Sequence, residues 1–344
     1  MNILAIDTSC DETAVAVTAD TKIVSSTVWS QSSLHSSFGG VFPSLAQREH
    51  QARIDFVLNK ALASSKLRFD EIDAIAVTVG PGLAVALGVG IEKAIEIATK
   101  YKKPLIPVNH IEAHLLSPFA VSKNQIPRKI DFPALGLILS GGTTLLCKIE
   151  AIGRYQVLAK TVDDALGEAL DKGARLLSLG YPGGPVLEKM ARLGSPKYKL
   201  PIPLIDDHIR DRFSYSGLKT AFVRLHSGFK KTSKEEVYDL ASSFQETAFK
   251  HIAVVLQYHL KNYQGELPKS LLFGGGVVNN VRIRQVIRGV LKPYGIKLEI
   301  PYNKKLMGDN AGMIGVCAYL KNKDSDLTSY HDYTKVDRHP GLQL

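Results

Sequence analysis

The sequence predicts an α/β protein built from two similar halves, each with a mixed sheet and flanking helices. In the first half, three successive strands precede an alternation of helix and strand, and the same order restarts at Pro133. A turn follows the first strand of each half. The 344 residues also exceed the size at which single cores stop growing, roughly 250–300 residues, so two lobes are expected.

In the first half, β-branched residues and the alternation of apolar with polar positions predict the three opening strands. Helix-length apolar periodicity then predicts helices over 44–62 and 83–100. Strands are expected at 2–7, 13–19, 22–30, 74–79 and 104–108. Asn109 follows the last of these strands and is expected to cap a further helix.

The second half repeats this order, with strands expected at 134–139, 145–150, 154–162, 270–275 and 297–301. The plan is similar to the actin and sugar-kinase architecture, in which nucleotide lies between the halves. We therefore expect a duplicated actin-like ATPase (ribonuclease H-like) fold with two lobes and an interlobe nucleotide cleft. The expected parts are an N-terminal lobe (1–130), a C-terminal lobe (131–330) and a tail (331–344).

A helical, basic insertion is expected around 185–235, where the apolar period breaks. Ten cations lie between Arg192 and Lys234, with Tyr198, Phe213 and Tyr215 among them. Together with a net charge of +10, this composition favours an anionic partner and makes the segment a candidate RNA-facing surface. A solvated basic linker explains it equally well.

Composition excludes several classes of protein. The hydrophobic fraction of 45% and the charged fraction of 22% do not suit a disordered or fibrous chain. No apolar run approaches the roughly 20 residues that cross a bilayer, and the acidic start does not resemble a signal peptide. Cys10, Cys147 and Cys317 are far apart, which favours a reducing compartment, so a cytoplasmic protein is expected.

The segment HIEAH carries the first candidate chemistry. Its four-residue spacing places His110 and His114 on one face of a helix, as in a metal site. Zinc proteases of the HExxH type have Glu directly after the first His, whereas Ile111 stands there, so protease chemistry is disfavoured. Local packing of two unrelated histidines is the alternative. Asp309, at an expected helix start, is either an N-cap or the third ligand of a two-His, one-carboxylate site for iron or zinc.

Glycine-rich turns form a second constellation that suits a nucleotide, because exposed backbone N–H groups can bind phosphate. One turn is SGGTT at 140–144, and the other is GGG at 274–276 before Asn280. Either turn alone is commonly a simple loop. Asp171 or Glu188 could bind ribose hydroxyls, although an ordinary amphipathic helix is the alternative. An acidic turn containing Asp7, Asp11 and Glu12 lies after the first strand.

Taken together, these segments resemble the TsaD family of tRNA threonylcarbamoyladenosine biosynthesis proteins. The resemblance extends from about residue 3 to 318 and rests on motifs in the family's order: DTSCDETAVAV, FGGVFPSLAQREH, GPGL, NHIEAH, LSGGTT, DALGEALDKGARLLSLGYPGGP, FSYSGLKTA, GGGVVNN and GDNAGMIG. The family usually has His or Asn where Thr143 stands, so no side-chain role is carried over to that position.

The resemblance implies transfer of a threonylcarbamoyl group from threonylcarbamoyl-adenylate to N6 of the adenosine 3′ of the anticodon in ANN-decoding tRNA. It implies one divalent metal, Fe²⁺ or Zn²⁺, on His110, His114 and Asp309, and a catalytic role for Asp11. Adenylate or an ATP-type nucleotide would be bound by Leu139, Ser140, Gly141, Gly142, Thr143, Asp171, Gly184, Glu188 and Asn280.

Expected partners are a paralogous actin-like subunit of the TsaB type and a small ATPase of the TsaE type, with no membrane. Two other functions fit the fold: a non-catalytic nucleotide-binding scaffold and a small-molecule kinase. Paired histidines argue against the kinase, which needs carboxylate-bound magnesium. Both glycine turns and all three ligand residues are present, which argues against the scaffold.

Overall fold

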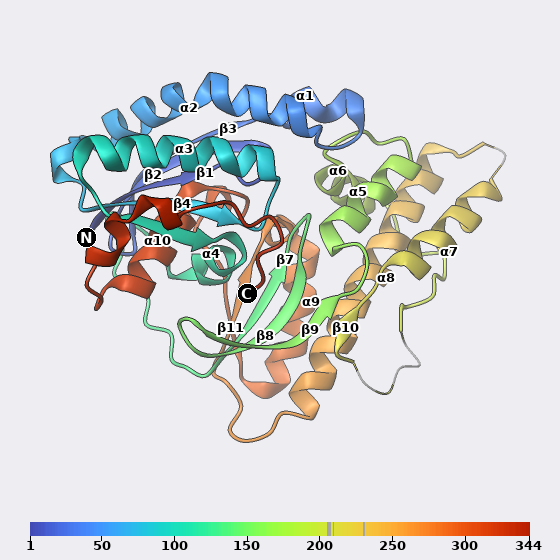
Figure 1. Ribbon diagram of the computed structural model, residues 1–344. Helices are drawn as coiled ribbons and strands as arrows, with labels where there is room; N and C mark the ends of the chain where they lie inside the picture. Colours follow the sequence, from blue (N-terminus) through green and yellow to red (C-terminus); the bar gives the residue numbers. More distant parts are fainter. Residues whose placement is uncertain (205–207, 209, 230) are drawn as a thin grey trace. The chain divides into compact units, whose positions relative to one another are not determined.

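A computed structural model describes residues 1–204, 208, 210–229 and 231–344, and the chain divides into two compact units (Figure 1). Unit 1 contains Met1–Ile130 and Ile300–Leu344, and unit 2 contains Asp131–Glu299. The sequence-based scheme had placed 131–330 in the second lobe and 331–344 in a separate tail. The structure differs because α10 (Ala311–Asn322) packs on the first two strands of unit 1.

The sheet of unit 1 has the strand order β5-β4-β1-β2-β3-β6. Its first three strands form two antiparallel hairpin pairs, and β4 and β5 add parallel to β1. The strands are β1 (Asn2–Asp7), β2 (Glu12–Ala19), β3 (Lys22–Ser30), β4 (Ala74–Gly80), β5 (Leu105–Asn109) and β6 (Val121–Ser122).

Helices cover both faces of this sheet because its strands bury side chains on both sides. Leu4 and Ile6 belong to one apolar cluster with residues of α2 (Pro43–Ser65) and α3 (Ala84–Tyr101). Ala5, which points the opposite way along β1, lies against Gly315 of α10. The remaining helices of unit 1 are short: α1 (Ser32–His35), η1 (Ser36–Phe38), η2 (Phe69–Glu71), α4 (His110–Leu116), η3 (Ser117–Phe119), η6 (Lys304–Leu306), η7 (Thr328–His331) and η8 (Tyr333–Lys335).

The sheet of unit 2 has the order β10-β9-β8-β7-β11-β12. As in unit 1, the first three strands are antiparallel neighbours, and two later strands, β11 and β12, add parallel beside the first. The short strand β10 adds parallel to β9 at the other edge. The strands are β7 (Ala134–Leu139), β8 (Thr144–Ala151), β9 (Arg154–Thr161), β10 (Arg212–Phe213), β11 (Ser270–Gly274) and β12 (Lys297–Glu299). This shared order confirms the predicted duplication of an actin-like fold.

The helices of unit 2 are α5 (Leu166–Leu176), α6 (Gly183–Ala191), α7 (Ser216–Ser227), α8 (Lys234–Lys261), η4 (Gly276–Asn279), α9 (Val281–Leu291) and η5 (Lys292–Tyr294). The long helix α8 contacts α5, α6, α7 and α9. It begins with a capping box, in which Ser233 Oγ accepts from Glu236 N and the Glu236 carboxylate accepts from Ser233 N.

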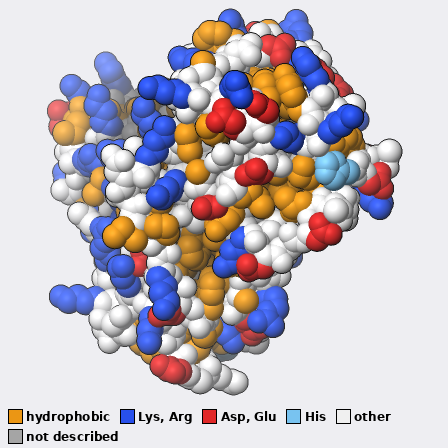
Figure 2. Space-filling view, turned by 90° about the vertical axis from the view of Figure 1, so that its left-hand side faces the viewer, with side chains coloured by type: hydrophobic (Ala, Val, Ile, Leu, Met, Phe, Trp, Pro, Cys, Tyr) orange, Lys and Arg blue, Asp and Glu red, His pale blue; other side chains and the backbone are white. Residues whose placement is uncertain are grey.

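On the face drawn in Figure 2, Lys and Arg side chains lie among Asp, Glu and apolar side chains. No helix in the described part of the chain combines the length and the apolarity that crossing a membrane requires.

Candidate metal centre and nucleotide-binding loops

The histidine helix α4 starts directly at the carboxyl end of the parallel strand β5. As predicted, Asn109 caps it: Oδ1 accepts from Ile111 N at 2.8 Å and from Glu112 N at 3.2 Å. These bonds satisfy backbone donors that the first helical turn would otherwise leave without partners. Carboxyl ends of parallel strands are where ligands bind in α/β sheets, so the cap places His110 at such an edge.

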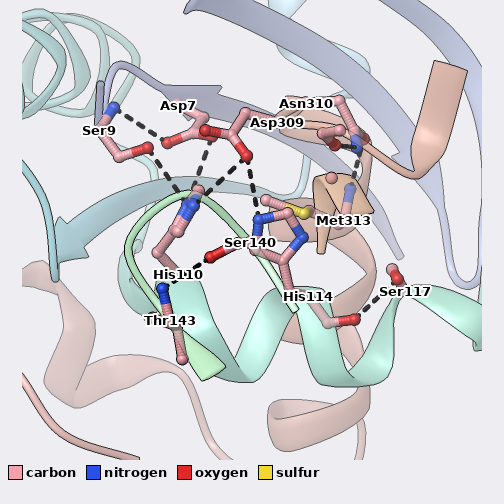
Figure 3. A network of polar contacts seen from close by, with 12 residues as sticks. Asp7, Ser9, His110, His114, Ser117, Ser140, Thr143, Asp309, Asn310 and Met313 are labelled. Carbon is pink, nitrogen blue, oxygen red and sulfur yellow. Dashed lines mark hydrogen bonds and ion pairs between the residues drawn. The ribbon is translucent and has the colours of Figure 1, made fainter. Parts of the chain in front are cut away.

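His110 and His114 project from α4 toward Asp309, as Figure 3 shows. The two ring centroids are 4.6 Å apart, with an interplanar angle of 82°. Asp309 Oδ1 lies 3.6 Å from His110 Nε2 and 3.0 Å from His114 Nε2. The candidate ligand atoms of the three residues all lie within 4.8 Å of one another.

Asn310, and not Asp309, caps helix α10. Its Oδ1 accepts from Met313 N at 3.0 Å, while its Nδ2 donates to Gly308 O at 2.8 Å. The alternative in which Asp309 is an N-cap is therefore wrong, and its carboxylate faces the two histidines instead. Burial opposes ionisation of Asp309, but the two imidazoles outweigh it and hold the pKa of this carboxyl well below its usual range.

The second nitrogen of His110 faces the end of β1. His110 Nδ1 lies 3.2 Å from Ser9 Oγ and 3.6 Å from Asp7 Oδ2. Burial lowers the pKa of His110, but Asp7 and Asp309 outweigh burial and raise it well above the ordinary value. Metal-bound imidazoles usually donate their other N–H to a carboxylate or similar acceptor, and Asp7 and Ser9 supply that arrangement.

These contacts fit a metal ion. Ligand bonds of about 2.0–2.2 Å imply that the donor atoms around one ion are roughly 3–3.5 Å apart, close to the separations between Asp309 and the two histidines. Two imidazoles and one carboxylate suit iron or zinc and leave coordination positions open for substrate. Asp7 Oδ2 is buried and, among the described residues, has no hydrogen-bond partner, so the site also has negative charge that a cation would neutralise.

The β1–β2 turn adds further carboxylates beside this centre. Asp11 is only 8% exposed. Burial, and then the charges of Asp309 and Asp11, raise the pKa of Glu12 well above its usual range. Burial, and then the charge of Asp11, also raise the pKa of the Cys10 thiol well above its usual value. The turn therefore concentrates acidic groups, and Cys10 and Glu12 on either side of Asp11 lie close enough to the candidate ligand Asp309 for its charge to raise their pKa values.

His50 of α2 supports this turn, although no role for it was predicted from the sequence. Its Nε2 lies 3.0 Å from Cys10 O, and its Nδ1 lies 2.8 Å from Thr13 Oγ1. The signal that could have identified it is position, because His50 is the polar member of a buried helix face that includes Ala46 and Ile54.

The GPGL loop after β4 also supports the turn. Leu83 N donates to Ser9 O at 2.9 Å. A Cβ on Gly82 would lie 2.4 Å from the same oxygen, so only glycine allows this close approach. The loop thereby fixes Ser9, which contacts His110.

In unit 2, the two glycine-rich turns meet at the carboxyl ends of β7 and β11. Ser140 closes the first turn, since Ser140 N donates to Thr143 O at 2.8 Å and Ser140 Oγ accepts from Thr143 N at 3.0 Å. Gly141 and Gly142 are exposed, with open space where a Cβ would lie. A Cβ on Gly275 would lie 2.4 Å from Leu139 O, so the second turn packs directly against the first.

The other expected nucleotide-binding residues connect α5, α6 and α9. Gly184 N donates to Asp171 Oδ1 at 2.7 Å, which joins the start of α6 to α5. Glu188 Oε1 accepts from Val281 N at 2.9 Å. Asn280 caps α9 and donates to Gln245 Oε1 at 2.8 Å. All of the expected nucleotide-binding residues thus lie in unit 2, whereas Asp11 and the metal-ligand candidates lie in unit 1.

The basic segment differs from the expected RNA-facing surface at two aromatic positions. Phe213 and Tyr215 are fully buried, and both rings pack edge-on against His251. The prediction that these two rings face RNA is therefore wrong. Tyr198 is half-buried against Phe229, with ring centroids 5.7 Å apart.

Solved structures with low sequence identity share the fold. Component A of the (R)-2-hydroxyglutaryl-CoA dehydratase of Acidaminococcus fermentans aligns with a TM-score of 0.53 at 14% identity, covering 93% of this chain and 98% of that chain. HypF from T. kodakarensis aligns with a TM-score of 0.59 at 16% identity, covering 93% of this chain and 48% of HypF. At this identity the likeness concerns the fold alone.

Sequence comparison is more specific. The family profile described as TsaD, tRNA N6-adenosine threonylcarbamoyltransferase, matches residues 22–316. A protein of that name from Persephonella marina is 42% identical over 337 residues, covering 95% of this chain and 92% of the relative. Another protein of that name, from Trichlorobacter lovleyi, is 43% identical over 325 residues, covering 93% of this chain and 92% of the relative. The chain therefore belongs to the TsaD family, the transferases that form threonylcarbamoyladenosine in tRNA.

Proposed function

We propose that this transferase holds one divalent metal on His110, His114 and Asp309, with Fe²⁺ the first candidate and Zn²⁺ the second. The observation that carries the proposal is the position of Asp309 Oδ1, which lies 3.6 Å and 3.0 Å from the Nε2 atoms of the two histidines. When bound, the metal would neutralise negative charge on the threonylcarbamoyl portion of the substrate.

Threonylcarbamoyl-adenylate is bound through its nucleotide by the loops of unit 2. The backbone of Leu139, Ser140, Gly141, Gly142 and Thr143 cradles phosphate, and Asp171, Gly184, Glu188 and Asn280 bind the nucleoside. Support comes from the exposure of Gly141 and Gly142 and from the direct packing of the two glycine turns. Exposed glycine backbone permits the close approach that a phosphate group requires.

In the reaction, N6 of the tRNA adenosine attacks the carbamoyl carbon. A new C–N bond forms, the C–O bond to the adenylate phosphate breaks, and AMP leaves with the electron pair. Asp11 accepts the proton that N6 loses. AMP is already a good leaving group, so correct placement of the reactants supplies most of the rate. His50 and the GPGL loop contribute by holding the turn on which Asp11 lies.

The transferase acts on ANN-decoding tRNA in the cytoplasm, with a paralogous subunit of the TsaB type and a small ATPase of the TsaE type. The free thiols of all three cysteines suit a reducing compartment. The cations of 192–234 that reach solvent suit a polyanion such as tRNA.

Two variants separate the two halves of this proposal. Asp171→Asn keeps an oxygen that can accept from Gly184 N but removes the charge, and should weaken adenylate affinity by about tenfold, the effect of one charge-assisted hydrogen bond. His110→Ala should leave the affinity for AMP, which lacks the threonylcarbamoyl group, unchanged and should abolish transfer to tRNA. Titration calorimetry measures the affinity, and nucleoside mass analysis measures transfer.

Unchanged adenylate affinity in Asp171→Asn would contradict the assignment of Asp171 to the nucleotide. Full transfer activity in His110→Ala would contradict the metal-ligand role of His110.

A further inference from the structure

We propose that the C-terminal segment Arg338–Gln343 positions the histidine helix α4 for metal binding. This inference rests on the metal centre of the proposed function and adds a positioning element to it. The segment lies about 230 residues after the helix in the sequence, yet both belong to unit 1. It contacts the carboxyl ends of β4 and β5, the edge of the sheet at which His110 lies.

Backbone hydrogen bonds attach the segment to the end of β4. His339 N donates to Val79 O at 2.6 Å, and Pro340 O accepts from Gly82 N at 3.3 Å. Leu342 packs against the apolar cluster of unit 1. The segment is therefore held in place by polar and apolar contacts together.

Two glycines of unit 1 leave room for the segment. A Cβ on Gly80 would lie 1.9 Å from His339 O, and a Cβ on Gly88 would lie 2.9 Å from Arg338 Nη1. Gly80 has a φ of +157°, at the margin of the region that favours glycine. The end of β4 and the start of α3 thus match this segment closely.

The link to the metal centre passes through Asn109. Its Nδ2 donates to Gln343 O at 2.8 Å, while its Oδ1 caps α4 through Ile111 N and Glu112 N. The amide is planar, so anchoring Nδ2 fixes the direction of Oδ1. The carbonyl of Gln343 consequently orients the cap of the helix that bears both histidines.

Loss of this link should weaken metal affinity more than it weakens the stability of the fold. Helix α4 has only seven residues, so its first turn depends on capping and tertiary contacts. His110 is the first residue of that turn, directly after Asn109. A displaced cap would move His110 relative to His114 and Asp309, and groups that orient metal ligands commonly change metal affinity by 10–100-fold.

The test is titration of the purified apoprotein with Co²⁺, followed by the visible absorption of the bound ion. Two variants break the link from opposite sides. A truncation after Asp337 removes the segment, and Asn109→Ser keeps a capping oxygen but loses the amide donor to Gln343. Each variant should weaken Co²⁺ affinity by about tenfold. The double variant should bind Co²⁺ as tightly as the truncated chain does, because both changes remove the same hydrogen bond between Asn109 and Gln343.

Gln343→Ala is the matched control, since the acceptor is the backbone carbonyl, and it should bind Co²⁺ as the parent does. Unchanged affinity in Asn109→Ser, with helix content and melting temperature also unchanged, would overturn the inference. If the truncated chain fails to fold, Asn109→Ser and Gln343→Ala decide the question.

His114→Ala distinguishes failure of this inference from failure of the metal centre itself. If the parent binds Co²⁺ and His114→Ala does not, the centre stands, and the positioning variants test the segment. If the parent and His114→Ala bind Co²⁺ alike, both the metal centre and this inference are overturned.

Discussion

At the scale of single residues, His50 connects helix α2 to the turn that carries Asp11. Burial lowers the pKa of His50, so the imidazole is neutral at physiological pH and has one N–H donor and one acceptor nitrogen. With Cys10 O 3.0 Å from Nε2 and Thr13 Oγ1 2.8 Å from Nδ1, both nitrogens have partners. The neutral ring can hold the Cys10 carbonyl and thereby fix the position of the next residue, Asp11.

We predict that His50→Ala lowers kcat for transfer by roughly ten- to a hundredfold, because small displacements of reacting groups carry costs of that size. KM for the adenylate should change little. His50→Gln should recover part of the rate, since its amide can donate to Cys10 O and accept from Thr13. Steady-state kinetics of both variants provides the measurement, and equal kcat values for parent, Ala and Gln variants would contradict this positioning role.

Sequence reasoning at this scale succeeded where residues are close in the chain. The spacing of His110 and His114 and the cap at Asn109 follow from helix geometry alone. The supporting contacts of Ser9 with His110, across 101 positions, and of His50 with Cys10, across 40, depend on how the strands and helices pack. Local pattern cannot specify such pairs, and it could not decide whether Asp309 caps α10 or faces the two histidines.

At the scale of elements, an ion pair joins α4 to α10. Glu112 Oε2 lies 2.6 Å from Lys321 Nζ, with side-chain exposures of 4% and 40%. Burial lowers the pKa of Lys321, but Glu112 outweighs burial and raises it. Because α4 bears the two histidines and α10 begins just after Asp309, the pair connects the two elements that supply the candidate ligands.

We predict that Lys321→Met lowers the free energy of unfolding more than Glu112→Gln does. Removal of the lysine takes one cation away from a carboxylate that stays buried, and should lower the free energy of unfolding by about 1–3 kcal/mol after allowance for the solvent exposure of Lys321. Removal of the carboxylate leaves a lysine that can reach solvent, so it should lower the free energy of unfolding by less than about 1 kcal/mol. Urea unfolding of both variants and of the double variant checks this order, and the reverse order would contradict it.

Most elements were predictable because each has a clear apolar period. The five strands expected in unit 1 match their observed ranges to within a residue, whereas β6 was not predicted. The helix expected over 44–62 is α2, Pro43–Ser65. Within the motif DALGEALDKGARLLSLGYPGGP, α5 ends at Leu176 and Gly183 begins α6. Glycines commonly terminate helices, so residue type alone does not predict a helix that starts at this glycine.

At the scale of the whole molecule, the two units share the order and the directions of five strands. They differ in the short edge strand, which comes last in unit 1 as β6 and fourth in unit 2 as β10. The sequence revealed this duplication because the order of elements repeats after Pro133. It did not reveal that Ile300–Leu344 belongs to unit 1, since a pattern along the chain shows where an element begins but not which sheet it covers. Because the chain from Ile300 onward folds back into unit 1, Asp309 lies beside the two histidines and Gln343 lies beside Asn109.

The central claim is that the chain transfers threonylcarbamoyl to tRNA through a centre built on His110, His114 and Asp309. The most direct measurement incubates purified, metal-loaded protein with threonylcarbamoyl-adenylate and unmodified ANN-decoding tRNA, with and without partner subunits, followed by nucleoside mass analysis. We predict threonylcarbamoyladenosine with the parent and none with Asp309→Ala. Equal modification by parent and variant would contradict the metal centre, and no modification under any condition despite tight adenylate binding would contradict the transferase activity itself.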